Sequence, residues 1–527
     1  MARATNTEPV ILTILDGWGN RADTDGNMIA NAKTPIFDRL AARGMRTMLA
    51  ASGEAVGLGP DQPGNVEAGH RTIGAGRTEH QFAVRVNAAF AGDGPEPIAD
   101  NRELQDLILK ARSVGGAIHL VGLISPAGVE GHQYHLAVLA ALMSHEGVQV
   151  WIHAILDGED TDAQSGADCL GEFLHDIEGA DNAQLASIMG RRYAFDRLQR
   201  EGPTGLALKA IAEAGAVAVD YAVPYVAECY EKGLCDADIP PAILAGYGGL
   251  RQDDALLLAL LRADGAAPLM AALSGAAETS ADGVPPVELS AVCSLTPLAY
   301  PLRDKIPSLF EEARLNGTLS EALAAVGKKQ LYLCDEASPF ALGTYQLGGR
   351  PAAFEGETHV ALPSPKRQQF EKKPDLAALD LANETVSAVK AGSADAIIVH
   401  FPNVGLAART GDPALVKKAV EIVDKSLGKI TAILEKRGGT LMITASHGNA
   451  EDMRTDDAGK ANARNTRAAV PLVIDGPPAT MANIALKPGR LEDVAPTFLA
   501  IFNAPPPQEM TGTSLLVSNE AEAHEAV

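Results

Sequence analysis

Short apolar runs along the chain alternate with longer segments that repeat apolar residues at spacings of three and four. The short runs predict buried β-strands at 10–15, 117–124, 148–156, 394–400, 440–444 and 470–474. Strands that alternate with helices form βαβ units, in which the strands lie parallel. The pattern therefore predicts an α/β fold with a mostly parallel, doubly wound sheet.

The longest periodic segment predicts a helix over 413–437. Asp412 can cap its first turn, Pro413 suits the first helical position, and the glycine pair 438–439 can end it. Its apolar residues form one stripe, made of Val416, Val420, Val423, Leu427, Ile430 and Leu434. This stripe predicts a buried core face without a functional role.

Composition narrows the class of protein. The 527 residues are 46% hydrophobic and 21% charged, which is typical of globular domains. No apolar run approaches the roughly 18 residues of a membrane span, and the first residues lack the apolar region of a secretory signal, so we expect a cytoplasmic protein without a membrane partner. The net charge of −23 disfavours binding to nucleic acid. Five scattered cysteines predict reduced thiols.

Two predicted strand ends carry polar groups that could take part in chemistry. Asp16 ends the strand in ILTILDGWGN, and Ser446 and His447 end the strand in LMITASHGNAED. In an open α/β sheet, ligands collect at the carboxyl ends of the strands. A carboxylate and a histidine at neighbouring ends could bind a metal ion. Alternatively, Asp16 caps a turn and His447 is a hydrogen-bonded structural residue.

Two further segments could bind anions. The glycine-rich loop DQPGNVEAGHRTIGAGR could hold an anion with its backbone N–H groups, and His70 within it is interpreted as a packing residue rather than a base. The segment MGRRYAFDR places Arg191, Arg192 and Arg197 together, and guanidinium groups bind phosphate and carboxylate in a bidentate fork. A solvated surface cluster is the alternative.

These segments together resemble the cofactor-independent phosphoglycerate mutases of the alkaline phosphatase superfamily. The resemblance rests on motifs in family order, among them ILDGWG, QPGNVEAGHRTIGAGR, HLVGLISPAGVEGH, IHAILDGED, GRRYAFDR and TASHGNAEDM. It implies an alkaline phosphatase-like domain, 1–80 with 305–516, which carries two manganese ions and a nucleophilic serine in that family. It also implies an inserted substrate-binding domain, 81–304. The residues 517–527 are predicted to form an acidic tail.

Most of the functional residues that the resemblance implies are replaced in this sequence. The nucleophile position holds Val66, and metal-ligand positions hold Gly405, Arg409, Ser446 and Asn465, so that Asp16 and His447 alone remain. Valine offers no oxygen to a phosphoryl group, and two groups cannot hold two manganese ions. We expect no metal cofactor, with Arg409 in the vacated space and paired with Asp16.

The inserted domain keeps part of the implied substrate site. Asp160, Arg191, Arg197 and Arg251 match substrate-contact positions, the last in LRQDD. Glu130, Glu159 and Asp254 stand where the family has histidine or arginine, which should weaken the binding of a phosphate dianion.

These replacements favour a mutase-like pseudoenzyme with a binding, regulatory or scaffolding role and an unidentified protein partner. One alternative is an active phosphoglycerate mutase that interconverts 2- and 3-phosphoglycerate, or another phosphoryl-transfer enzyme with a rearranged site. A third hypothesis is a sensor that binds a phosphorylated small molecule without converting it.

Overall fold

The computed structural model describes residues 8–518, except 93, 95, 196–202, 263, 277–283, 285–286, 299–301, 312–314, 337–352, 364–373, 375, 455–460 and 478–483. The chain forms two compact units, Met1–Val84 with Ala313–Val527 and Arg85–Glu312. The domain boundaries expected from the sequence stay a prediction. Most of the expected acidic tail, 517–527, lies outside the described residues, although Val517 and Ser518 belong to a strand.

The first unit contains an eight-stranded sheet with the order β11-β10-β12-β1-β13-β14-β2-β16. Its strands are β1 (Val10–Leu15), β2 (Met45–Ala50), β10 (Gln330–Asp335), β11 (Glu357–Leu362), β12 (Ala396–Phe401), β13 (Thr440–Thr444), β14 (Val470–Asp475) and β16 (Gly489–Arg490). β14 runs antiparallel to both of its neighbours, and the other pairs are parallel. Strands β15 (Ile484–Leu486) and β17 (Leu516–Ser518) form a separate ribbon. The predicted α/β fold class is confirmed.

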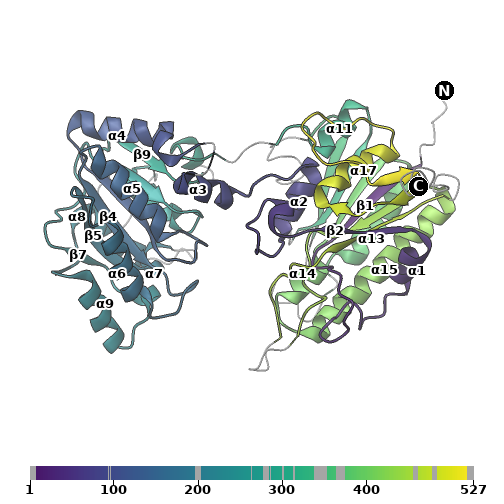
Figure 1. The fold of residues 1–527 in the computed structure, drawn as a ribbon, viewed down its shortest axis with the longest axis horizontal. Helices are drawn as coiled ribbons and strands as arrows, with labels where there is room; N and C mark the ends of the chain where they lie inside the picture. Colours follow the sequence, from purple (N-terminus) through teal and green to yellow (C-terminus); the bar gives the residue numbers. More distant parts are fainter. Residues whose placement is uncertain are drawn as a thin grey trace, which may run out of the picture. The chain divides into compact units, whose positions relative to one another are not determined.

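Helices cover both faces of this sheet (Figure 1). One layer holds α1 (Pro35–Arg43), α13 (Ala378–Ala391) and α15 (Pro413–Arg437), and the other holds α2 (Val66–Ala75), α11 (Leu319–Ala325) and α17 (Val494–Ile501). The short helix α14 (Asn403–Ala408) packs against α15. The helix predicted over 413–437 is confirmed with its cap, because the Asp412 side chain accepts from the backbone N–H groups of Ala414 and Leu415. All six residues of its apolar stripe are buried.

The second unit contains a seven-stranded sheet with the order β6-β7-β5-β4-β3-β8-β9. Its strands are β3 (Ile118–Ile124), β4 (Val150–Leu156), β5 (Ala183–Gly190), β6 (Val217–Val219), β7 (Ala242–Leu244), β8 (Ala255–Ala259) and β9 (Ala291–Ser294). Its helices are α4 (Arg102–Val114), α5 (Gln133–His145), α6 (Gly166–Asp176), α7 (Arg191–Ala194), α8 (Pro203–Glu213), α9 (Ala222–Glu231) and α10 (Ala267–Leu273). The boundary between the units falls within α3 (Phe82–Ala91). Among the described residues, no helix has the length and apolar character that crossing a bilayer requires.

A buried chain of hydrogen bonds crosses β5, β4 and β3 and ends at Asp254, the residue before β8. The Ser187 hydroxyl lies 2.8 Å from His153 Nδ1, His153 Nε2 lies 3.0 Å from His119 Nδ1, and His119 Nε2 lies 3.1 Å from Asp254 Oδ2. The Asp254 carboxylate also accepts from the backbone N–H groups of Ala117 and Arg251, both at 2.8 Å. Asp254 is therefore a structural residue of this sheet, which is a different role from the phosphate-repelling one expected from the sequence.

The two histidines in this series of hydrogen bonds make the stability of the second unit sensitive to acid. Burial lowers the pKa of His153 well below its usual value, with a further lowering by His119, and burial also lowers the pKa of His119 although Asp254 opposes it. Below about pH 6.5 the unfolded histidines take up protons that the folded ones do not. The free energy of unfolding should therefore fall as the pH decreases from 6.5, by at most about 1.4 kcal/mol per pH unit for each histidine, until the pH reaches the pKa of that histidine in the folded protein.

A His153→Gln variant should lose this dependence in part, because glutamine keeps a donor and an acceptor without titrating. Between pH 6.5 and pH 5, the slope of its free energy of unfolding against pH should be smaller than that of the unmodified chain, by about 1.4 kcal/mol per pH unit. Urea unfolding followed by Trp151 fluorescence, in a Trp18→Phe background, measures the slope. Equal slopes with and without His153 would contradict the assignment.

Candidate metal centre

Three parallel strands place their carboxyl ends side by side in the first unit. β1 lies between β12 and β13, with Ile14 paired to His400 on one side and to Thr444 on the other. Side chains two positions apart on a strand share a face, so Asp16 lies on the same face as Ile14 and His400. The residues that follow β13 reach the same edge, where Gly448 forms a bridge with Gly17.

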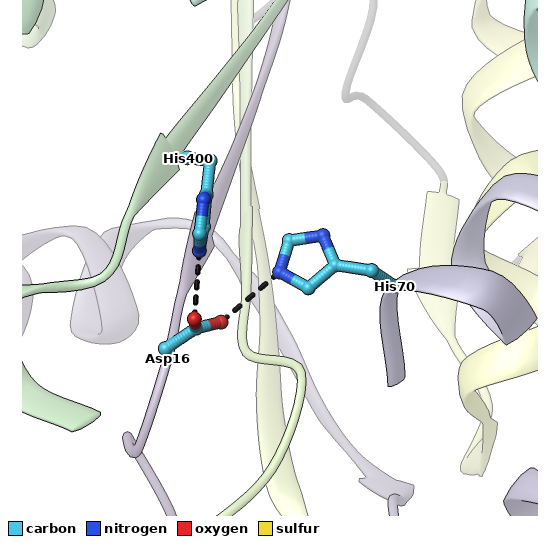
Figure 2. A group of neighbouring side chains, drawn as sticks. All are labelled: Asp16, His70 and His400. Carbon is cyan, nitrogen blue, oxygen red and sulfur yellow. Dashed lines mark hydrogen bonds and ion pairs between the residues drawn. The ribbon is translucent and has the colours of Figure 1, made fainter. Parts of the chain in front are cut away.

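Asp16 is the centre of a buried cluster that these strands form with α2. His70 Nε2 lies 3.0 Å from Asp16 Oδ1, and His400 Nε2 lies 2.7 Å from Asp16 Oδ2 (Figure 2). The two imidazole rings meet edge to face, with centroids 4.4 Å apart. The Ser446 hydroxyl donates a third hydrogen bond to Asp16 Oδ1. One carboxylate thus binds side chains from three other segments of the chain.

Close backbone packing brings α2 to this position. A Cβ atom on Gly69 would lie 2.2 Å from the Ser446 carbonyl oxygen, so only glycine lets the helix approach the strand end so closely. Asn65 caps the helix by accepting from the Ala68 N–H at 2.8 Å. The helix then presents His70, the residue after Gly69, to Asp16.

The electrostatics of the cluster follow from its burial. Burial opposes ionisation of Asp16, but His400 and His70 outweigh it and hold the Asp16 pKa well below its usual value. Burial lowers the pKa of His70, with a further lowering by His400. Burial also lowers the pKa of His447 to about 4. Asp16 is therefore a carboxylate at neutral pH, and His70 and His447 are neutral.

These side chains fit a divalent metal ion. One ligand atom from each of Asp16, His70 and His400 lies within 4.8 Å of the other two, and this is the one such group among the described residues. Ligands about 2.0–2.1 Å from a tetrahedral ion lie roughly 3.3 Å apart. The nitrogen–oxygen distances from His70 and His400 to Asp16, 3.0 Å and 2.7 Å, are somewhat shorter than this. In the described part of the chain, His70 Nδ1, His400 Nδ1 and His447 Nε2 are buried without a hydrogen-bond partner. Divalent transition-metal ions bind imidazole nitrogens and carboxylate oxygens of this kind.

The resemblance implies that Asp16 and His447 are the remaining metal ligands. His447 lies beside the cluster around Asp16 rather than within it. Its Nδ1 atom lies 2.8 Å from the Ser446 hydroxyl, and Ser446 connects it to Asp16. Both side chains are fully buried. The structure thus brings Asp16, Ser446 and His447 together, as the strand ends suggested.

The other metal-ligand positions do not supply donors to the centre. Gly405 lies in α14, where a Cβ atom would meet the Asp16 Cβ at 3.1 Å. The Asn465 side chain donates to the Gly64 carbonyl at 2.8 Å and accepts from Asn449 at 3.1 Å, which ties two loops together.

The expected pair between Arg409 and Asp16 is wrong. Arg409 follows the last residue of α14 and is exposed, and no ion pair joins it to Asp16 in the described part of the chain. Histidines from other positions take its place, because they hydrogen-bond to Asp16 without bringing a permanent charge into a buried space.

Val66 is the first residue of α2 and is half-buried. It stands four residues before His70, and residues four apart lie on the same face of a helix. A side chain at position 66 therefore projects from the face of α2 that contacts Asp16.

The predicted substrate residues of the second unit separate into two groups. Arg191, at the start of α7, is buried and lies between carboxylates, with a contact to Asp157 and distances of 3.1 Å to Asp160, 3.6 Å to Glu159 and 4.0 Å to Glu130. Asp160 and Arg191 follow β4 and β5, so they share the carboxyl edge of the sheet. Arg197 lies outside the described residues.

Arg251 lies at the opposite edge, because it precedes β8 and its backbone N–H donates to Asp254. β8 runs parallel to β3, β3 to β4 and β4 to β5. The arginine at the carboxyl end of β8 is Arg262, whose backbone N–H donates to the backbone carbonyl of Glu130 at 3.1 Å. Sequence reasoning missed Arg262, although the apolar stretch that ends immediately before it, at Leu261, marks a strand end.

Sequence reasoning also missed His70 and His400 as possible ligands. The sequence predicts His400 only as the end of a strand, although a histidine in the otherwise apolar run IIVHF is a signal of a buried polar contact. It favours a packing role for His70, and no local pattern predicts that α2 would place this residue against Asp16.

Known proteins resemble this chain over its full length. The model of the Metalloenzyme superfamily matches residues 8–506. The 2,3-bisphosphoglycerate-independent phosphoglycerate mutase of Gluconobacter oxydans (strain 621H) is 36% identical over 98% of this chain and 100% of its own length. The corresponding mutase of Rhodopseudomonas palustris is 35% identical over 96% of this chain and 99% of its own length. A solved phosphoglycerate mutase from Leishmania mexicana, 23% identical over 98% and 99%, shares the fold with a TM-score of 0.72.

The expectation of a non-catalytic pseudoenzyme is wrong, because the full-length relatives are named as mutases and the fold assembles a possible metal site. The expectation of no metal cofactor is wrong as well, because the matching family is one of metalloenzymes and Asp16, His70 and His400 can share an ion. The physical reason is that position-by-position matching detects lost ligands but not histidines that converge from elsewhere. The chain belongs to the Metalloenzyme superfamily and, within it, to the family of 2,3-bisphosphoglycerate-independent phosphoglycerate mutases.

Proposed function

We propose that this protein is a metal-dependent phosphoglycerate mutase that moves a phosphoryl group between the two hydroxyl positions of glycerate. The observation that carries the proposal is the buried centre of Asp16, His70 and His400. The chain that holds it matches proteins named as mutases over 99–100% of their length. The phosphorylated small molecule expected from the sequence is then 2- or 3-phosphoglycerate.

Asp16, His70 and His400 would hold the ion, and their burial would keep water away from it. An ion bound there would supply Lewis-acid stabilisation of charge on the phosphoryl oxygens. Asp16 would neutralise part of the ion's charge, and His70 and His400 would each offer an imidazole nitrogen. Exclusion of water strengthens every electrostatic interaction in the centre.

The phosphoryl acceptor on this chain must differ from the one that the resemblance implies, because Val66 has no hydroxyl. Among the described residues, Ser446 is the one whose hydroxyl contacts Asp16. We assign the acceptor role to Ser446: its Oγ–P bond forms as the ester P–O bond of the substrate breaks. The hydroxyl turns from Asp16 Oδ1 to His447 Nδ1, 2.8 Å away, and its proton passes to that atom and then to the leaving oxygen of glycerate. Because Ser446 is fully buried, this step requires the centre to open to the substrate.

Within the second unit, the carboxyl edge of the sheet offers cations to an anionic ligand. Arg191 is surrounded by Asp157, Asp160, Glu159 and Glu130, so its charge is largely compensated. Arg262 is exposed at the same edge and forms no ion pair among the described residues. Arg262 is therefore the better candidate for a direct bond to phosphate or carboxylate.

This assignment predicts different effects for two arginine variants. Arg262→Ala should lower kcat/KM for phosphoglycerate by about tenfold or more, which is the usual cost of a lost charge-assisted hydrogen bond. Arg251→Ala, at the opposite edge of the sheet, should change kcat/KM by less than about twofold. Steady-state kinetics of both variants decides, and a larger loss in Arg251→Ala would contradict the assignment.

The test of the proposed function is conversion of 3-phosphoglycerate by the purified chain, followed by phosphorus NMR without coupling enzymes. Protein stripped of metal should be inactive, and protein supplied with a divalent ion should produce 2-phosphoglycerate. Complete loading with metal and no conversion would refute the proposal. A cytoplasmic location stays a prediction, which fractionation of the native cell tests.

A further inference from the structure

We propose that the Asp16 centre binds a single, imidazole-preferring divalent ion of the Zn²⁺ or Co²⁺ kind, through Asp16, His70 and His400. The family resemblance implies two manganese ions instead, with Asp16 and His447 as the remaining ligands. The inference deepens the proposed function and rests on it only for the catalytic role of the ion.

The ligand set differs from the implied one because of what the fold brings together. His70 comes from α2 and His400 from β12, and both direct Nε2 at the Asp16 carboxylate, at 3.0 Å and 2.7 Å (Figure 2). His447 is not a member of the group whose ligand atoms lie within 4.8 Å of one another. Its Nδ1 atom is engaged with Ser446 instead.

A single ion follows from the absence of donors for a second. At the other implied positions, Gly405 has no side chain and Asn465 is engaged by Gly64 and Asn449. Arg409 contributes a positive charge that acts on His447. Among the described residues, no second group of three histidine, cysteine or carboxylate side chains lies close enough to share an ion.

The identity of the ion follows from the donor atoms. Two imidazole nitrogens and one carboxylate are the three protein ligands typical of catalytic zinc, which keeps a further position open. Magnesium and manganese favour oxygen-rich sets, and affinity for a given set of nitrogen and oxygen donors rises from Mn²⁺ to Co²⁺, with Zn²⁺ also above Mn²⁺. A set with two imidazole nitrogens, from His70 and His400, should therefore prefer Zn²⁺ or Co²⁺ to Mn²⁺.

Metal titration of the full-length, metal-free chain tests the inference without any substrate. Calorimetry and metal analysis should give one Zn²⁺ or Co²⁺ per chain, bound at least about tenfold more tightly than Mn²⁺. His70→Gln and His400→Gln should each weaken Zn²⁺ binding about 100-fold or more. His447→Gln should change it by less than about threefold, and so should His135→Gln, a matched control at a buried histidine of the second unit whose Nδ1 has no partner among the described residues.

Two ions per chain, tighter binding of Mn²⁺ than of Zn²⁺, or an equal loss in His447→Gln and His400→Gln would each overturn the inference. If a glutamine variant does not fold, as judged by circular dichroism, the stoichiometry and metal order of the unmodified chain still decide. The Co²⁺ form adds an independent readout, because its visible absorption should change in His400→Gln and stay the same in His135→Gln. One bound Zn²⁺ without mutase turnover would refute the proposed function alone.

Discussion

Replacement of Val66 by serine is expected to raise mutase turnover at least about tenfold. Position 66 is the first residue of α2 and lies on the helix face of His70, which contacts Asp16. A hydroxyl there can accept a phosphoryl group at a helix N-terminus, where the unpaired N–H groups and the helix dipole stabilise negative charge. Ser446, by contrast, is fully buried and already bonded to Asp16 and His447.

Initial rates of conversion of 3-phosphoglycerate measure the gain. Val66→Ala is the matched control, because it removes the same methyl groups without adding a hydroxyl. Peptide mapping after incubation with substrate should place the phosphoryl group on Ser446 in the unmodified chain and on the new serine in Val66→Ser. Equal rates for the serine and alanine variants would show that position 66 has no access to the substrate.

Replacement of Asp16 by asparagine should lower turnover by a factor of about 10³ or more and abolish tight metal binding. Asparagine has no charge, and in the metal-free protein its NH₂ group would face an imidazole N–H that now donates to the carboxylate. An unpaired buried donor costs about 1–3 kcal/mol, so a modest loss of stability should accompany the loss of activity.

Asp424→Asn is the matched control for Asp16→Asn. Asp424 is also a buried carboxylate, but it accepts from the backbone N–H groups of Ile36 and Phe37 at the start of α1, away from the centre. We expect this variant to lose stability and to keep metal binding and turnover per folded molecule. Metal analysis and kinetics of both variants make the comparison. An Asp16→Asn protein that still binds one ion tightly would contradict the ligand assignment.

Much of the fold could be predicted because local patterns are strong where one face is buried. The period of α15 and its Asp412 cap are visible in the sequence, as are the strands that place Asp16 and Ser446 at one sheet edge. The parallel arrangement followed from the alternation of strands and helices. These features depend on neighbours in the chain, which the sequence displays.

The ligand set could not be predicted, because it depends on contacts between distant segments. His400 lies 384 residues from Asp16 in the chain and reaches it through the pairing of β1 with β12. His70 reaches Asp16 through the close approach of Gly69 to Ser446. A position-by-position comparison detects that ligands are missing at Gly405 and Arg409. It does not detect replacements that come from other elements, so the sequence alone predicts no metal site.

The most direct test is a titration of the metal-free chain in which metal occupancy and initial mutase rate are measured on the same samples. The rate of conversion of 3-phosphoglycerate should rise in proportion to occupancy and reach its maximum at one ion per chain. An occupied Asp16 centre without any conversion would contradict this prediction.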